Sequence, residues 1–188
     1  MMKELWDQFE AWLTVHWPDG LASLNPPATD EELALLEDAL GAKLPEDFSE
    51  CLRVHNGQSD SAGGLFDNSK FLSTGAILEE WKVWKDLLDS GEFEGIHSEP
   101  EDGIKSDWWN ASWIPMTHNG CGDHYCIDLA PARGGHCGQV ITMWHDMLER
   151  RVQAKTFGEW FQNYVAAVIN GEYTYAADFG GLVKKGQA

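Results

Sequence analysis

The sequence predicts an α+β fold, a single domain in which helices flank a mostly antiparallel sheet. Apolar residues recur at helical spacing before residue 90 and again after residue 155, and a group of short strand patterns lies between residues 113 and 145. Runs of helices around a central group of strands are typical of this fold class. A chain of 188 residues, 43% of them hydrophobic, suits one domain with a sizeable core.

The first part of the chain is predicted to be helical. Residues 3–16 form an amphipathic helix, and residues 17–28, with three prolines and a glycine, form a linker. A capping box at Thr29 and Glu32 begins a second helix, and Gly41 is its expected end. The apolar face of the first helix carries Leu5, Trp6, Phe9, Trp12 and Leu13.

Two further helices are expected before residue 90. Pro45 begins a short helix that ends at the Asn-Gly pair of residues 56–57 and forms a hairpin with the preceding helix. After a flexible loop at residues 58–64, Ser73 or Thr74 caps a longer helix. Its apolar face carries Ile77, Trp81, Trp84 and Leu88.

The strands and the last helix follow. A capping box at Thr156 and Glu159 begins a helix whose aromatic face makes it the strongest helical pattern in the chain. That face carries Phe157, Trp160, Phe161, Tyr164, Val165 and Val168. Short strands are expected at residues 65–66, 71–72, 113–117, 124–130, 139–145 and, at a sheet edge, 151–155.

The charge is strongly unbalanced, with 13 basic and 31 acidic residues and a net charge of −18. Residues 1–50 hold 12 acids and two bases, whereas residues 151–188 hold three acids and four bases. Such a field repels nucleic acid and anionic membranes and favours a basic protein partner. Solubility alone is the alternative explanation.

The four cysteines are expected to be reduced. The N-terminus shows no signal-peptide pattern, and no apolar run approaches the roughly 20 residues that span a membrane. A cytoplasmic protein is therefore the expectation.

One stretch, residues 118–137, carries a dense group of potentially chemical side chains. Its spacings only loosely resemble those of zinc sites, and Gly120, Gly122 and Asp123 have the properties of turn residues. A Cys-His-Asp set can be assembled on paper, but neighbours in sequence are weak indicators of a catalytic set. The group comprises His118, Cys121, Asp123, His124, Cys126, Asp128, His136 and Cys137. We expect no catalytic residue, no metal ligand and no cofactor, while a metal-dependent enzyme stays open as an alternative.

Several motifs in order resemble the SUKH superfamily, which takes in fungal cell-wall-synthesis regulators of the Smi/Knr type and bacterial toxin-immunity proteins. The motifs are PPATDEEL (26–33), LEDALGAKLPEDF (36–48), HNG (55–57), WIPM (113–116), GCGD (120–123), CIDL (126–129) and TFGEW (156–160). The resemblance implies an α+β fold, no known catalytic activity and protein binding as the general function.

The same resemblance divides the chain. Residues 1–25 are expected to form a helical extension with its linker, residues 26–171 the SUKH-like domain, and residues 172–188 a C-terminal tail. Within the domain, residues 89–112 form an acidic surface insertion.

The insertion supplies the predicted partner contacts, because exposed tryptophan beside acids is typical of a binding hot spot. A hydrophobic plug that attaches the insertion to the sheet is the alternative for its two tryptophans. The predicted contact residues are Glu101, Asp102, Asp107, Trp108 and Trp109.

The leading hypothesis is a cytoplasmic immunity protein that neutralises a cognate toxin, such as a nuclease, by direct binding. An acidic protein can occupy the basic groove with which a nuclease binds phosphates. A regulator of cell-wall or envelope synthesis is the second hypothesis, and a metal-dependent enzyme using residues 118–137 is the third.

Overall fold

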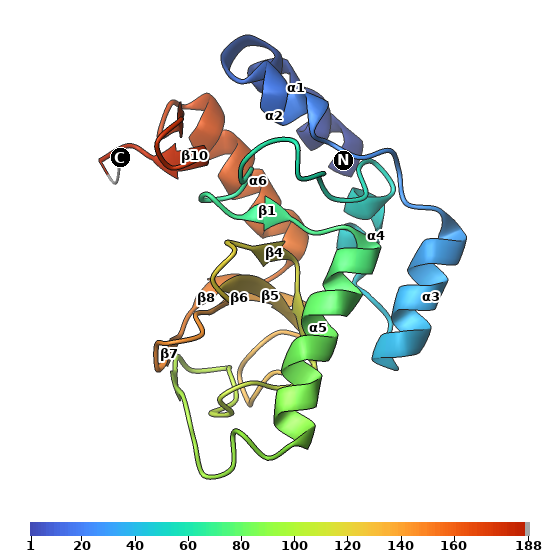
Figure 1. Ribbon diagram of the computed structural model, residues 1–188, viewed down its shortest axis with the longest axis vertical. Helices are drawn as coiled ribbons and strands as arrows, with labels where there is room; N and C mark the ends of the chain where they lie inside the picture. Colours follow the sequence, from blue (N-terminus) through green and yellow to red (C-terminus); the bar gives the residue numbers. More distant parts are fainter. Residues whose placement is uncertain (187–188) are drawn as a thin grey trace.

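The computed structural model describes residues 1–186 and confirms the α+β fold. Its centre is a four-stranded antiparallel sheet with the strand order β3-β5-β6-β8 (Figure 1). The strands are β3 (Trp113–Pro115), β5 (His124–Asp128), β6 (Gln139–Met143) and β8 (Val152–Ala154). The helices are α1 (Met2–His16), α2 (Pro18–Ala22), α3 (Asp30–Leu40), α4 (Glu46–Leu52), α5 (Thr74–Asp89) and α6 (Phe157–Ile169).

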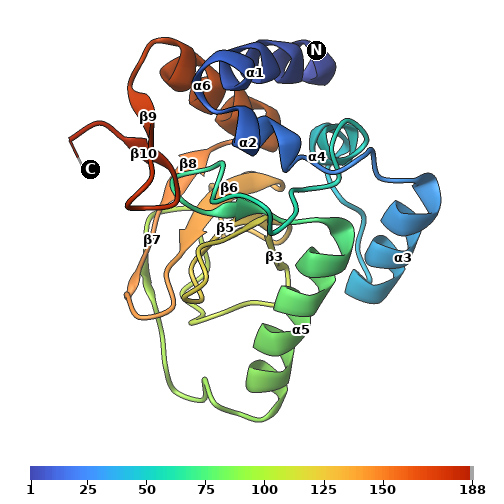
Figure 2. The same cartoon turned by 45° about the horizontal axis from the view of Figure 1, so that its top comes forward.

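Helices cover both faces of the sheet, as the turned view makes clear (Figure 2). On one face Trp160 of α6 lies against Tyr125 of β5, with ring centroids 5.5 Å apart. On the other face Trp84 of α5 donates a hydrogen bond to His124, the neighbouring residue of the same strand. All five residues of β5 are therefore buried. Apolar and polar residues alternate along this strand, a pattern that usually indicates a strand with only one buried face.

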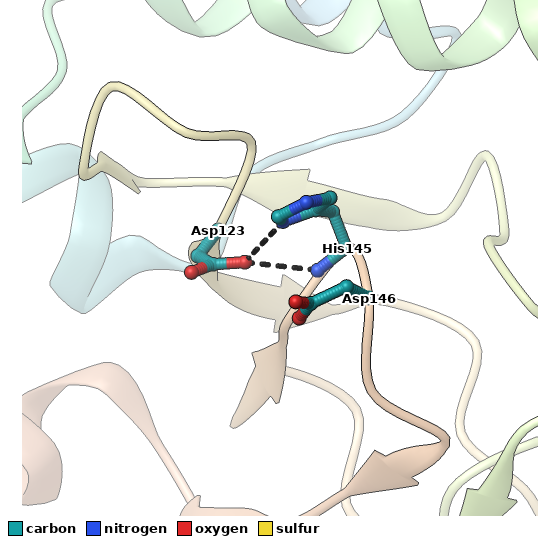
Figure 3. Close-up of side chains that lie close together, drawn as sticks. All are labelled: Asp123, His145 and Asp146. Atoms are coloured by element: carbon teal, nitrogen blue, oxygen red, sulfur yellow. Dashed lines mark hydrogen bonds and ion pairs between the residues drawn. The ribbon is translucent and has the colours of Figure 1, made fainter.

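Three two-stranded pairings surround the main sheet. The strand β1 (Lys70–Phe71) pairs with β4 (Thr117–His118), and β2 (Glu99–Pro100) pairs in parallel with β7 (Glu149–Arg150). The turn that joins β4 to β5 is tied to the end of β6 by Asp123 (Figure 3).

Two segments expected to be irregular contain regular structure. The predicted linker at 17–28 includes α2, whose first residue is a proline, a residue well suited to begin a helix. The predicted tail from residue 172 forms a hairpin of β9 (Tyr173–Ala176) and β10 (Gly181–Lys184), and Leu182 of this hairpin is fully buried. Residues 187–188 of that tail lie outside the described part of the chain.

The helix α4 ends earlier than the sequence predicts, at Leu52 rather than at Asn56. Asn56 is buried, and its side-chain oxygen accepts a hydrogen bond from the Thr74 amide at the start of α5. The side-chain amide of Asn56 also donates to the Thr74 hydroxyl, so this residue connects two helices instead of extending one.

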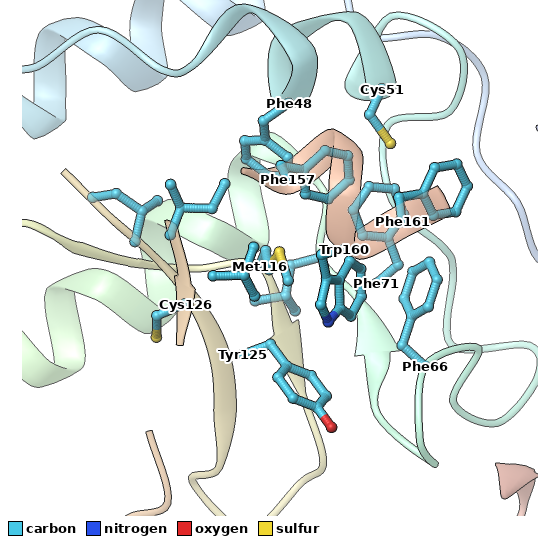
Figure 4. Close-up of a cluster of buried hydrophobic side chains, with 14 of the residues drawn as sticks. Phe48, Cys51, Phe66, Phe71, Met116, Tyr125, Cys126, Phe157, Trp160 and Phe161 are labelled. Carbon is cyan, nitrogen blue, oxygen red and sulfur yellow. The ribbon is translucent and has the colours of Figure 1, made fainter. Parts of the chain in front are cut away.

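The hydrophobic core is built around the aromatic face of α6. Figure 4 shows Phe157, Trp160 and Phe161 of α6 between Phe48 of α4 and Tyr125 of β5. The ring of Phe48 meets that of Phe157 edge-on at 4.9 Å. Interlocking rings of this kind contribute packing energy beyond the area that they bury.

The N-terminal helix belongs to the same core. The side chains of Trp6, Phe9 and Leu13 are fully buried. The indole of Trp6 lies 4.9 Å from the ring of Phe161 and donates its N–H to the sulfur of Cys51. The helix expected as an extension thus packs as part of the domain.

None of the helices within residues 1–186 is both long and apolar enough to cross a membrane.

The packing of α1 predicts a large effect of Trp6→Ala. The variant leaves a cavity in the core, and we expect a loss of about 3–5 kcal/mol of unfolding free energy in urea titrations. Trp12 of the same helix is only partly buried and stacks on His16, so Trp12→Ala is the matched control with a much smaller loss. Equal losses in the two variants would contradict the view that α1 is part of the core.

Candidate functional site

The structure separates the chemical residues of the 118–137 stretch. Cys126 lies in the core, and burial raises the pKa of its thiol, which makes it a poor nucleophile or ligand. Cys121 is exposed on the β4–β5 turn, whereas Cys137 is exposed in the loop at the opposite end of β5. The two exposed thiols thus lie at opposite ends of the sheet.

His124 is held as a neutral side chain inside the sheet. Its Nε2 accepts the Trp84 indole N–H at 3.0 Å, so its Nδ1 carries the proton and donates to the Thr117 carbonyl at 2.7 Å. Burial is the main cause that lowers its pKa from 6.5 to about 4. Both ring nitrogens are occupied, which leaves neither free for a metal or a substrate.

Next to it, His118 faces a carboxylate. Its Nδ1 lies 2.9 Å from Oε1 of Glu80 in α5, and this hydrogen bond lowers the pKa of Glu80 against the opposing effect of burial. The other oxygen of Glu80 is 3.9 Å from Nε2 of His124. The Glu80–His118 pair joins α5 to the edge strand β4.

Asp123 organises the turn between β4 and β5. One of its carboxylate oxygens accepts hydrogen bonds from both the backbone amide and Nδ1 of His145 at 2.9 Å (Figure 3). The other oxygen accepts a hydrogen bond from the side-chain amide of Asn119 at 2.7 Å. Burial acts to raise the pKa of Asp123, but the interactions with His145 and Asn119 together outweigh it and lower the pKa. The residue therefore has the structural role that the turn pattern predicts.

Asp123, His145 and Asp146 form the one group of three potential metal ligands within residues 1–186 (Figure 3). Only Asp123 belongs to the stretch singled out from the sequence. Both carboxylate oxygens of Asp123 already accept hydrogen bonds that hold the β4–β5 turn, and the side chains of His145 and Asp146 are exposed. The group of three therefore gives little support to the metal-enzyme alternative.

At the C-terminal end of β5, Asp128, His136 and Cys137 form hydrogen bonds with residues close to them in the structure. Burial raises the pKa of Asp128, while the Gln139 side-chain amide, 2.9 Å away, opposes this effect. The thiol of Cys137 donates to the carbonyl of Leu129, and the amide of His136 donates to the side chain of Gln139.

The acidic insertion is anchored to the sheet by Arg150. The guanidinium is buried, donates to the carbonyl of Trp108 at 2.9 Å and lies 5.0 Å from the centre of the Trp108 ring. Its other terminal nitrogen, Nη1, donates to the carbonyls of Met147 and Glu149. These contacts keep the insertion ordered along β7.

Trp109 fills the core beneath the insertion. It is 2% exposed and stacks on Trp84 with ring centroids 6.3 Å apart, so it acts as the hydrophobic plug and its side chain cannot reach a partner in this fold. Trp108 is half-buried and Asp107 accepts a bond from Asn110. Glu101 and Asp102 are exposed, although a Glu101 oxygen accepts the Val152 amide. A partner-binding role for these four residues stays a prediction.

A pocket of about 560 Å³ opens between the β4–β5 turn and a second turn at residues 66–69. In that second turn Asp67 and Asn68 both have positive φ angles, 48° and 58°, and Phe66 and Ser69 exchange backbone hydrogen bonds. This is the backbone of a two-residue hairpin turn, which Asp and Asn tolerate well. Further lining residues are Asn119, Cys121, Asp123, Tyr125, Trp144, Gln153, Tyr173 and Lys184.

Sequence reasoning did not identify Asp67 or Asn68 as site residues. The signal was present, because an Asp-Asn pair between Phe66 and Ser69 is suited to a tight turn. The pocket itself could not be foreseen, since its walls come from four segments that are distant in sequence.

The buried state of His124 predicts a pH-dependent stability. Between pH 6.5 and about 4 the unfolded histidine binds a proton that the folded one does not, so stability falls as the pH falls through this window. The loss attributable to this group is on the order of 3 kcal/mol. An NMR titration of the His124 ring should give a midpoint near pH 4, and His124→Gln should flatten the acid limb of the stability curve. A midpoint near 6.5 would contradict the buried neutral state.

Comparison with known proteins places these features in a family. Residues 27–163, most of the chain, match the family model described as the SMI1 / KNR4 family (SUKH-1). The match includes the Asp67 turn, the β4–β5 turn and most of α6.

Individual relatives resemble nearly the whole chain. The cell wall assembly regulator SMI1 of Saccharomyces cerevisiae is 21% identical over 92% of this chain and 41% of its own length. The glucan synthesis regulatory protein of Neurospora crassa is 23% identical over 89% of this chain and 38% of its own. F-box only protein 3 of Bos taurus is 28% identical over 94% of this chain and 36% of its own.

The chain thus spans about two fifths of the length of these relatives, which share one domain with it. Because the family model covers most of the chain, this protein belongs to the SMI1 / KNR4 family (SUKH-1).

Proposed function

We propose that this protein is a non-enzymatic binding module that acts in the cytoplasm by direct binding of a basic protein, as an immunity protein neutralises its cognate toxin. The observation that carries the proposal is the net charge of −18 on a domain whose fungal relatives are named as regulators. A nuclease toxin fits this chemistry, because its phosphate-binding groove is basic.

The placement of the acids supports this function. Most of the carboxylates are exposed, and seven acids against one lysine lie in residues 89–107 alone. An uncompensated acidic surface raises the rate of encounter with a basic partner and disfavours nucleic acid and anionic membranes.

The non-enzymatic part of the proposal is supported by how the 118–137 stretch is used. Cys126 and His124 are buried in packing and hydrogen bonds, and Asp123 holds a turn. The cytoplasmic part is supported by the four cysteines, none of which is paired in a disulfide.

A second function, regulation of cell-wall or envelope synthesis, is favoured by the names of the fungal relatives. Gene neighbourhood separates the two candidates. An adjacent gene for a large toxin favours immunity, whereas an isolated gene favours regulation.

The immunity version predicts that the product of the neighbouring gene binds this protein and that co-expression rescues cells from it. The association rate should fall at least about tenfold between low and physiological salt, because screening weakens electrostatic steering. Binding kinetics at several salt concentrations and a growth assay test both expectations. Absence of binding together with absence of rescue would refute the immunity version, and a salt-independent rate would refute the role of the charge.

A further inference from the structure

The pocket between the Asp67 turn and the β4–β5 turn holds a negative charge that the fold does not neutralise. The Asp67 carboxylate is half-buried and accepts the hydroxyl of Tyr125 at 2.8 Å. No basic side chain of residues 1–186 forms an ion pair with it. Lys184 also lines the pocket, but its ammonium pairs with Glu172 at 3.9 Å. A concave site thus contains an anion that lacks a cation.

Three aromatic side chains, Tyr125, Trp144 and Tyr173, line the pocket that holds this carboxylate. Burial, reinforced by Asp67, raises the pKa of Tyr125 and of Tyr173, so both phenols stay protonated at neutral pH. Trp144 is half-buried and meets Tyr125 edge-on, with ring centroids 5.3 Å apart. A carboxylate beside indole and phenol rings is a favourable environment for a guanidinium, which combines ion pairing with stacking.

We propose that this pocket binds an arginine side chain of the basic partner, an assignment that rests on the proposed function. Asp67 accepts the guanidinium N–H groups, Trp144 offers a ring for stacking, and Asn68 and Asn119 form part of the polar wall. Arginine suits the site better than lysine, because its planar fork of donors matches the two oxygens of a carboxylate while its flat face can stack on an aromatic ring.

A second pocket next to this site can bind the residues that flank the arginine of the partner. This pocket, of about 470 Å³, shares Asn68 and Asn119 with the first. Its lining includes Glu79, Glu80 and the ion pair between Asp60 and Lys70. Two adjoining acidic pockets suit a basic segment whose arginine enters the first of them.

Asp67→Asn isolates the charge of the pocket. Asparagine tolerates the left-handed backbone at φ 48°, and its amide oxygen can still accept the Tyr125 hydroxyl. The matched control is Asp86→Asn, which removes one charge from the exposed surface of α5 outside both pockets.

The probe is the capped peptide acetyl-Gly-Arg-Gly-amide, titrated into the full chain and followed by two-dimensional NMR. We expect saturable shifts of the Trp144 indole and of the Asn68 and Asn119 amides. The citrulline counterpart, which is neutral but similar in shape, should bind at least about tenfold more weakly, and so should the arginine peptide to Asp67→Asn. Asp86→Asn should bind within about twofold of the wild type.

Two exposed cysteines give an independent readout without any substitution. Cys121 lines the pocket and Cys137 does not. Saturating arginine peptide should slow alkylation of Cys121 by iodoacetamide and leave Cys137 unchanged, as measured by mass spectrometry.

The assignment is overturned if the citrulline peptide binds equally well, if Asp86→Asn weakens binding as much as Asp67→Asn, or if the two thiols are protected alike. Free arginine binding more tightly than the capped peptide would also overturn it, in favour of an amino-acid site. A protein partner that binds wild type and Asp67→Asn equally refutes the pocket and leaves the proposed function standing. Arginine binding without any basic protein partner refutes the function instead.

Discussion

The packing of Phe66 against the aromatic face of α6 is the interaction on which the rest of the structure depends. The ring of Phe66 lies 5.1 Å from that of Trp160 and 4.9 Å from that of Tyr164. The hydroxyl of Tyr164 donates to the carbonyl of Leu65, so ring packing and a hydrogen bond hold the same turn. Because Asp67 follows Phe66 directly in the chain, the burial of the Phe66 ring determines the position of Asp67.

The same core aligns the other walls of the pocket. Tyr125 lies against Trp160 on one side and carries the hydroxyl that binds Asp67 on the other. The C-terminal hairpin is tied to this turn, since the Asn68 amide donates to the carbonyl of Leu182. A polar site is thus supported by rigid apolar packing, which lowers the cost of holding an uncompensated carboxylate in one geometry.

Local patterns predicted much of this fold. Three predicted features depend only on residues that are close in sequence, and the structure contains all of them. They are the capping box at Thr29, the serine N-cap of α5 and the helical spacing of the aromatic residues in α6. The end of α4 was missed because Asn56 is recruited by Thr74, a contact across 18 residues. Trp109 could not be assigned from sequence either, since only the fold shows that Trp84 stacks on it. The pocket escaped prediction for the same reason, because Asp67 and Tyr125 are 58 residues apart.

The central claim is that a basic partner binds the acidic pocket region, and that the 118–137 stretch shapes this region without performing chemistry. Hydrogen–deuterium exchange of the full chain, free and bound to the basic partner, tests it most directly. We expect slower exchange in residues 64–69, 119–125 and 144–146 of the complex. Protection confined to α1 and α3, or to the loop at 131–138 at the other end of the sheet, would contradict it.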